Sequence, residues 1–68
     1  MPKLPSSKEI IRTLEKHGFE FVSQRGSHAK YRSGERTVII PTPRKEIPLG
    51  TFRSIVRQSG LYARDFKK

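Results

Sequence analysis

Residues 26–40 read GSHAKYRSGERTVII, and this stretch decides the fold. It holds two runs with strand character, His28–Arg32 and the β-branched run Arg36–Ile40, separated by a three-residue turn. A third run, Phe19–Arg25, precedes them across a two-residue turn. Connections this short leave room only for hairpins. The sequence therefore predicts a three-stranded antiparallel meander.

An amphipathic helix is predicted on either side of these strands. The first begins at a capping box opened by Ser6 and ends at Gly18, because glycine tolerates the left-handed conformation that closes a helix. The second begins near Pro48 or Leu49 and ends at Gly60. The element order is thus α-β-β-β-α.

This order predicts an α+β fold with a single domain over residues 1–68. Two helices should cover one face of the antiparallel sheet, giving a two-layer sandwich whose other face stays open. Residues 41–47 should be irregular because of their two prolines, and residues 61–66 fit one further helical turn before a frayed tail at Lys67 and Lys68. The expected core consists of apolar side chains at helical or alternating spacing: Ile10, Leu14, Phe19 or Phe21, Val22, Tyr31, Val38 or Ile39, Ile40, Phe52, Ile55 and Val56.

Positive charge dominates the composition. The chain has 15 lysines and arginines against six acidic residues, which gives a net charge of +9 and indicates a polyanionic partner such as RNA. It has no cysteine, so a disulfide framework is excluded. Residues 1–5 lack the apolar run of a signal peptide, and the longest aliphatic run, Val38-Ile39-Ile40, is too short to span a membrane. We expect a soluble, cytoplasmic protein.

His28 is the strongest candidate for chemistry. In an alternating strand His28, Lys30 and Arg32 share one face, whereas Ala29 and Tyr31 point to the other. A histidine titrates near neutral pH and can accept a proton from the 2′-hydroxyl of RNA, while nearby cations stabilise the charge that develops on phosphate. The alternative is an ordinary, half-exposed strand histidine.

The remaining polar residues define the limits of this hypothesis. His17 is explained by the helix end, and the carboxylates are scattered, so no metal site and no cofactor are predicted. Arg53 and Arg57 lie four apart on the second helix, either as a solvent face or as a contact for RNA or a partner. The predicted RNA contacts are Arg25, Lys30, Arg32, Arg44 and Lys45, of which the last two form either a phosphate clamp or a solvated loop.

Four stretches closely resemble the HicA (YcfA-like) toxin family: Ser7–Phe19, Gly26–Arg32, Thr37–Pro41 and Lys45–Leu61. The resemblance implies a fold similar to double-stranded-RNA-binding domains, and cleavage of mRNA that arrests translation. It also implies a HicB-like antitoxin that covers the active site, and a toxin–antitoxin complex that can bind operator DNA. The catalytic histidine of the family corresponds to His28.

The resemblance leaves one role open. Many relatives carry one or two histidines near the positions of Thr42 and Pro43, where this chain has none. The proton donor to the leaving oxygen therefore remains open among Lys30, Lys45 and water. Two other functions also fit the charge: a non-catalytic RNA-binding module, which needs no histidine, and an interaction protein whose basic face meets an acidic partner.

Overall fold

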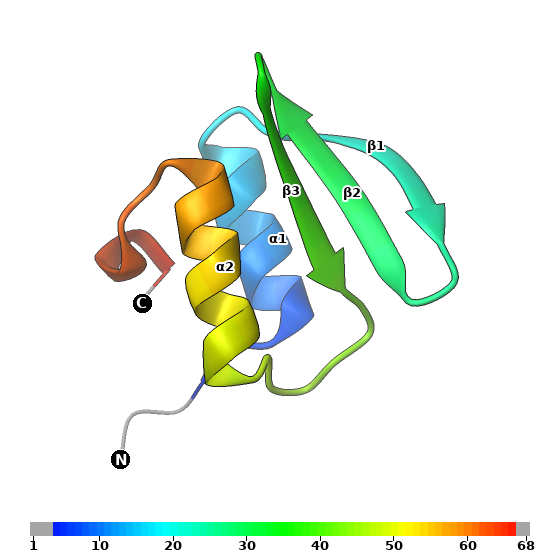
Figure 1. Cartoon of the computed structure of the whole chain (residues 1–68), viewed down its shortest axis with the longest axis vertical. Coiled ribbons are helices and arrows are strands. Elements are labelled where there is room, and N and C mark those ends of the chain that lie inside the picture. Colours follow the sequence, from blue (N-terminus) through cyan, green and yellow to red (C-terminus); the bar gives the residue numbers. More distant parts are fainter. Residues whose placement is uncertain (1–3, 67–68) are drawn as a thin grey trace.

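The structure is a computed structural model that describes residues 4–66 and confirms the predicted order of elements (Figure 1). Its elements are α1 (Ser7–Lys16), β1 (Glu20–Arg25), β2 (His28–Ser33), β3 (Arg36–Pro41), α2 (Leu49–Ser59) and the 3-10 helix η1 (Ala63–Phe66). The further turn expected over residues 61–66 is η1. The tail expected at Lys67 and Lys68 lies outside the described residues.

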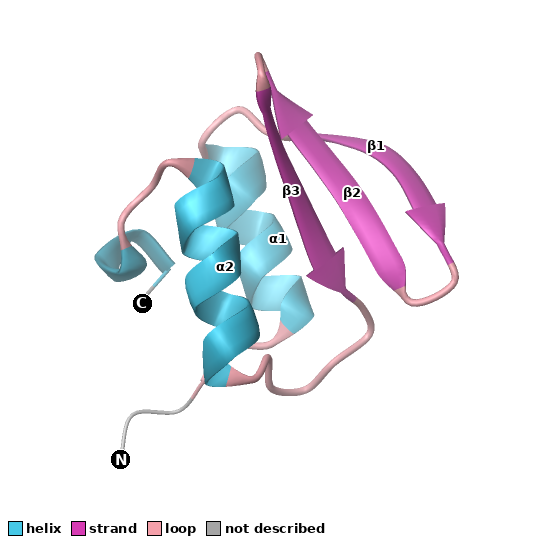
Figure 2. Ribbon diagram, in the orientation of Figure 1, coloured by secondary structure: helices cyan, strands magenta, loops and turns pink. Residues whose placement is uncertain are grey.

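The three strands form one antiparallel sheet in the order β1-β2-β3, as predicted, with α1 and α2 together on one side of it (Figure 2). β3 continues to Pro41, so the expectation that Pro41 begins the irregular segment is wrong. The N–H of Thr42 donates to the carbonyl of Ser27 at 2.8 Å. Backbone N–H groups of successive strand residues point to opposite sides of the strand. Since the N–H of Thr42 points toward β2, the nitrogen of Pro41 points away from β2, and the N–H that proline lacks is not needed for the hydrogen bonds between β2 and β3.

β1 lies at the edge of the sheet, away from α2, and all six of its residues are exposed (Figure 1). Its register against β2 passes from Phe21 opposite Tyr31 to Ser23 opposite Lys30, which leaves Val22 in a bulge. Val22 is 49% exposed, so its predicted place in the core is wrong. The helices cover β2 and β3, and β1 has no helix against it.

The core lies between the helices and the inner face of the sheet. Its buried members are Ile10, Leu14, Phe19, Ala29, Tyr31, Val38, Ile40, Ile47, Ile55 and Phe66. The sequence left two core positions open, and the structure buries Phe19 rather than Phe21, and Val38 rather than Ile39. The predicted core residues Phe52 and Val56 are only partly buried against this cluster. Sequence reasoning missed Ile47 and Phe66, which lie outside the two long helices and the sheet.

The segment between β3 and α2 is irregular, as expected, but it is firmly attached to α1. The Ser7 hydroxyl accepts from the N–H of Arg44 at 3.0 Å and donates to the carbonyl of Arg44 at 3.3 Å. The N–H of Ile47 also donates to the carbonyl of Pro5, at 2.8 Å. These bonds fix where α2 begins relative to α1.

Candidate nucleic-acid interface

The sheet face turned away from the helices presents a row of polar side chains from β2. His28, Lys30 and Arg32 are all exposed, whereas the alternating Ala29 and Tyr31 are only 2% and 7% exposed. This is the alternation expected from the sequence. The imidazole therefore lies on an uncovered surface that a large ligand can reach.

Around His28 this face is hollowed into a shallow depression of about 360 Å³. Its lining residues are Ser23, Arg25, His28, Lys30 and Ile39. Arg25 is the cross-strand neighbour of His28, and Ser23 and Ile39 flank Lys30 from β1 and β3. Directly opposed residues have Cβ atoms about 4.5–5.5 Å apart. The depression thus brings one titratable imidazole between two cations, without a carboxylate in its lining.

Arg32 shares this face but does not line the depression. Its Nε donates to the carbonyl of Gly34 at 2.9 Å, which holds the guanidinium against the turn between β2 and β3. That turn lies at the opposite end of β2 from His28. Arg32 is therefore placed to contact a ligand beyond the depression.

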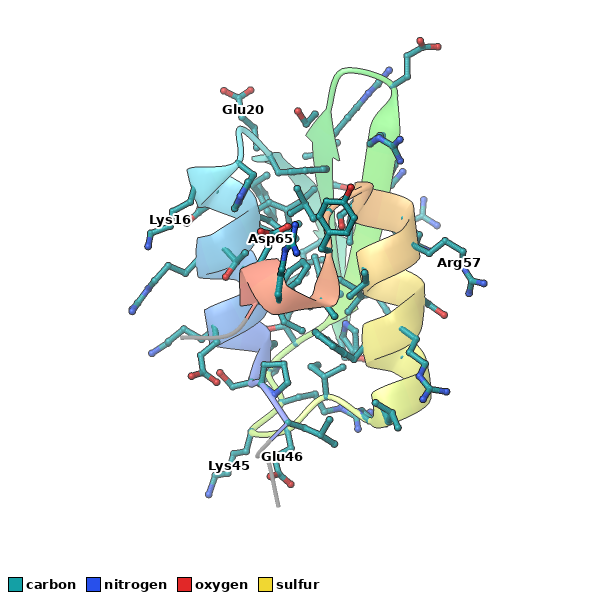
Figure 3. The ribbon with its side chains drawn as sticks, turned by 90° about the vertical axis from the view of Figure 1, so that its left-hand side faces the viewer. Lys16, Glu20, Lys45, Glu46, Arg57 and Asp65 are labelled. Carbon is teal, nitrogen blue, oxygen red and sulfur yellow. The ribbon has the colours of Figure 1, made fainter. Side chains whose placement is uncertain are left out.

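Arg44 and Lys45, the predicted phosphate clamp, do not line the depression either. The backbone of Arg44 is held by Ser7 at the start of α1. Lys45 projects into solvent at the end of the molecule where α1 begins, beside Glu46 (Figure 3). Of the five predicted RNA contacts, the structure therefore brings Arg25 and Lys30 together with His28, and of the two side chains considered as proton donors only Lys30 is there.

The other histidine lies elsewhere. The Nδ1 atom of His17 is 2.9 Å from the carbonyl of Thr13, at the C-cap of α1, which fits its expected role at the helix end. It borders a second hollow of about 460 Å³ between α1 and η1, whose lining includes Glu9 and Asp65 as well as cations. Within residues 4–66 no three His, Cys, Asp or Glu side chains group so that they could hold a metal ion, and no helix has the length and apolar character to cross a membrane.

Sequence reasoning missed Ser23 and Ile39, the contributions of β1 and β3 to the depression. Strand alternation predicts faces within one strand, but cross-strand neighbours depend on register. The two-residue turn Gly26-Ser27 indicates from sequence that Arg25 lies opposite His28, because a turn of this length makes the residues on either side of it direct cross-strand neighbours. The bulge at Val22 then shifts the register, so the pairing of Ser23 with Lys30 cannot be predicted from the length of the turn.

Comparison with known protein families identifies a match that covers most of the chain. A family model described as the HicA toxin of bacterial toxin–antitoxin systems matches residues 7–61, from the first residue of α1 to just beyond the cap of α2. No curated protein matches the chain. The matched region includes the whole sheet and every residue that lines the depression.

Proposed function

The chain belongs to the HicA family of toxins from bacterial toxin–antitoxin systems, and from this membership we propose that it is an endoribonuclease that cleaves mRNA without a metal ion and so inhibits translation. The observation that carries the proposal is the position of His28, exposed in a depression that Arg25 and Lys30 also line. A protein with this substrate would act in the cytoplasm.

In the proposed reaction RNA supplies its own nucleophile. His28 accepts the proton of a 2′-hydroxyl as that oxygen attacks the adjacent phosphorus. The new P–O2′ bond forms as the P–O5′ bond breaks, which leaves a 2′,3′-cyclic phosphate and, after protonation, a free 5′-hydroxyl. Arg25 and Lys30 stabilise the charge that grows on the phosphate oxygens. The leaving 5′-oxygen takes its proton from Lys30 or from water.

The proposed chemistry would need no resident metal. Nucleases that use two metal ions hold them with clustered carboxylates. Among the described residues no such cluster exists, and the depression is lined by cations instead. Cationic side chains would take the place of metal ions in binding the phosphate.

Membership of a toxin–antitoxin family implies an antitoxin partner. We propose a HicB-like protein whose acidic surface covers the open sheet face, so that RNA and antitoxin compete for Arg25, His28 and Lys30. The net charge of +9 would speed the approach of either ligand. The complex of toxin and antitoxin is a candidate for binding operator DNA.

Substitution of His28 tests the mechanism. We expect His28→Ala to lower the rate of RNA cleavage in EDTA by about 10²–10⁴-fold, the usual contribution of a general base. His17→Ala is the matched control, because it removes an exposed histidine whose Nδ1 lies against its own helix and which does not line the depression. A 2′-deoxy substitution at the cleaved nucleotide should also stop cleavage, since it removes the nucleophile.

Three outcomes separate the candidate functions. Loss of cleavage in His28→Ala, with folding and RNA binding retained, supports the general-base role. Undiminished cleavage by that variant excludes His28 from the mechanism. Tight binding by the wild-type protein that leaves the RNA intact would instead favour the non-catalytic RNA-binding module.

A further inference from the structure

Acidic residues are confined to part of this fold, whereas basic residues occur throughout it. The three neighbouring elements β2, β3 and α2 contain no Asp or Glu, but they carry Lys30, Arg32, Arg36, Arg53 and Arg57. The acidic residues belong to α1, β1, η1 and the connecting segments: Glu9, Glu15, Glu20, Glu35, Glu46 and Asp65. The basic region is therefore wider than the depression around His28.

The open sheet face and the outer face of α2 meet at the edge formed by β3. The side-chain Oε1 of Gln58, on α2, accepts from the N–H of Ile39 at 3.2 Å. Ile39 also lines the depression beside His28 and Lys30. A ligand that leaves the depression across β3 therefore arrives directly on α2.

Arg53 and Arg57 are the two cations of α2, and at 3.6 residues per turn they lie about 140° and 100° around the helix axis from Gln58. Both are exposed, and their spacing places them about 6 Å apart along the helix axis. Within residues 4–66 neither guanidinium makes a hydrogen bond or an ion pair, and Arg57 projects from α2 into solvent (Figure 3). Like charges one turn apart destabilise a helix, and a bound phosphate would relieve that repulsion.

We propose that Arg53 and Arg57 form a second phosphate-binding surface, so that an RNA strand held at His28 continues across the edge of β3 onto α2. This inference rests on the proposed function and adds the class of substrate. The path turns around the edge of a domain whose longest dimension is 33 Å. Duplex nucleic acid resists such bending, since the persistence length of DNA is about 50 nm. The substrate is therefore single-stranded RNA longer than the depression alone can hold.

The test measures binding of uncleavable, 2′-O-methylated single strands of four and sixteen nucleotides. The variant Arg53→Gln/Arg57→Gln is compared with Arg12→Gln/Lys16→Gln, which removes two exposed cations at the same spacing from α1. Both variants reach the same net charge, so the long-range attraction of RNA falls equally in the two.

We expect the α2 variant to bind the sixteen-nucleotide strand about 10- to 30-fold more weakly at 0.1 M salt, because two phosphate contacts contribute about 1.4 to the slope of log K against log salt on single strands. That slope should become shallower by the same amount. Binding of the four-nucleotide strand by the α2 variant, and of both strands by the α1 variant, should stay within about twofold of the wild type, because only the long-range attraction falls there.

Equal losses in the two variants, or no loss in the α2 variant, would overturn the second surface while leaving the proposal for His28 intact. Failure of the wild-type protein to bind either strand would overturn the proposed function itself. If the glutamine pair prevents folding, a photoreactive base placed at each end of the longer strand tests the wild-type protein. Crosslinks to residues 49–59 support the path, and crosslinks confined to β1 and β2 contradict it.

Discussion

The hydroxyl of Ser7 joins the first turn of α1 to the segment that leads into α2, and Ser7→Ala tests how strongly that segment is held. The side chain is only 3% exposed, and its Oγ makes two hydrogen bonds with the backbone of Arg44. Alanine would leave the N–H of Arg44 without its acceptor. The carbonyl of Arg44 would keep one donor, the backbone N–H of Ser7 at 3.0 Å.

The expected loss of stability follows from that one orphaned donor. An unsatisfied, partly buried N–H lowers the free energy of unfolding by about 1–3 kcal/mol. Alanine has a higher helix propensity than serine, which raises the free energy of unfolding by at most about 0.5 kcal/mol. The net loss is then about 0.5–3 kcal/mol, which for a domain of this size lowers the Tm by roughly 2–24 °C.

Denaturation followed by circular dichroism, in urea and by heating, measures this loss. Ser54→Ala is the control, because the Ser54 hydroxyl bonds only to the carbonyl of Gly50 within α2, at 3.3 Å, and leaves no donor unsatisfied. It shares the gain in helix propensity and should change stability by less than about 0.5 kcal/mol. Equal stabilities of the two alanine variants would refute the role assigned to Ser7.

Two further pairs of substitutions test the fold. Gly60 has φ +74°, a left-handed conformation that alanine disfavours, so Gly60→Ala should lower the free energy of unfolding by about 1–2 kcal/mol. Gly50 lies inside α2 with open space around it, so Gly50→Ala should raise the free energy of unfolding by roughly 0.5–1 kcal/mol in the same urea titration. Burial, and then the charge of Glu15, raise the pKa of the Tyr31 hydroxyl above its ordinary value of 10.0. As the pH rises, the Tyr31 hydroxyl loses its proton in the unfolded chain before it does so in the folded one. The stabilisation linked to the raised pKa is therefore fully present below pH 10 and is lost as the pH rises further. Urea midpoints between pH 9 and 11 should therefore fall less steeply in Tyr31→Phe than in the control Tyr62→Phe.

Some of the candidate site could be predicted from sequence because its cause is local. The alternation of β2 separates His28 and Lys30 from Ala29 and Tyr31, and the structure places the four residues on the expected faces. Strand geometry alone has this period of two. The caps of the helices are equally local, and both Ser6 and Gly60 occupy the expected positions.

The errors arose where distant parts of the chain meet. Val22 fits a core position by composition, but the bulge beside it depends on the pairing of β1 with β2. Ile47 lies in a proline-rich loop without periodicity, yet it is fully buried because Pro5 and α1 hold that loop in place. The same attachment holds the backbone of Arg44 beside Ser7, and Arg44 does not line the depression around His28.

The layering of the fold leaves the candidate site exposed. Two helices of 10 and 11 residues lie on one face of the sheet, and within residues 4–66 all six residues of β1 are exposed. Ile39 is the one aliphatic side chain that lines the depression, where the other lining residues are polar or charged. A ligand bound in the depression would therefore gain its affinity mainly from Arg25 and Lys30. Both proposed ligands, RNA and an acidic antitoxin, would meet this requirement in the same way, and the proposal therefore places them on one surface.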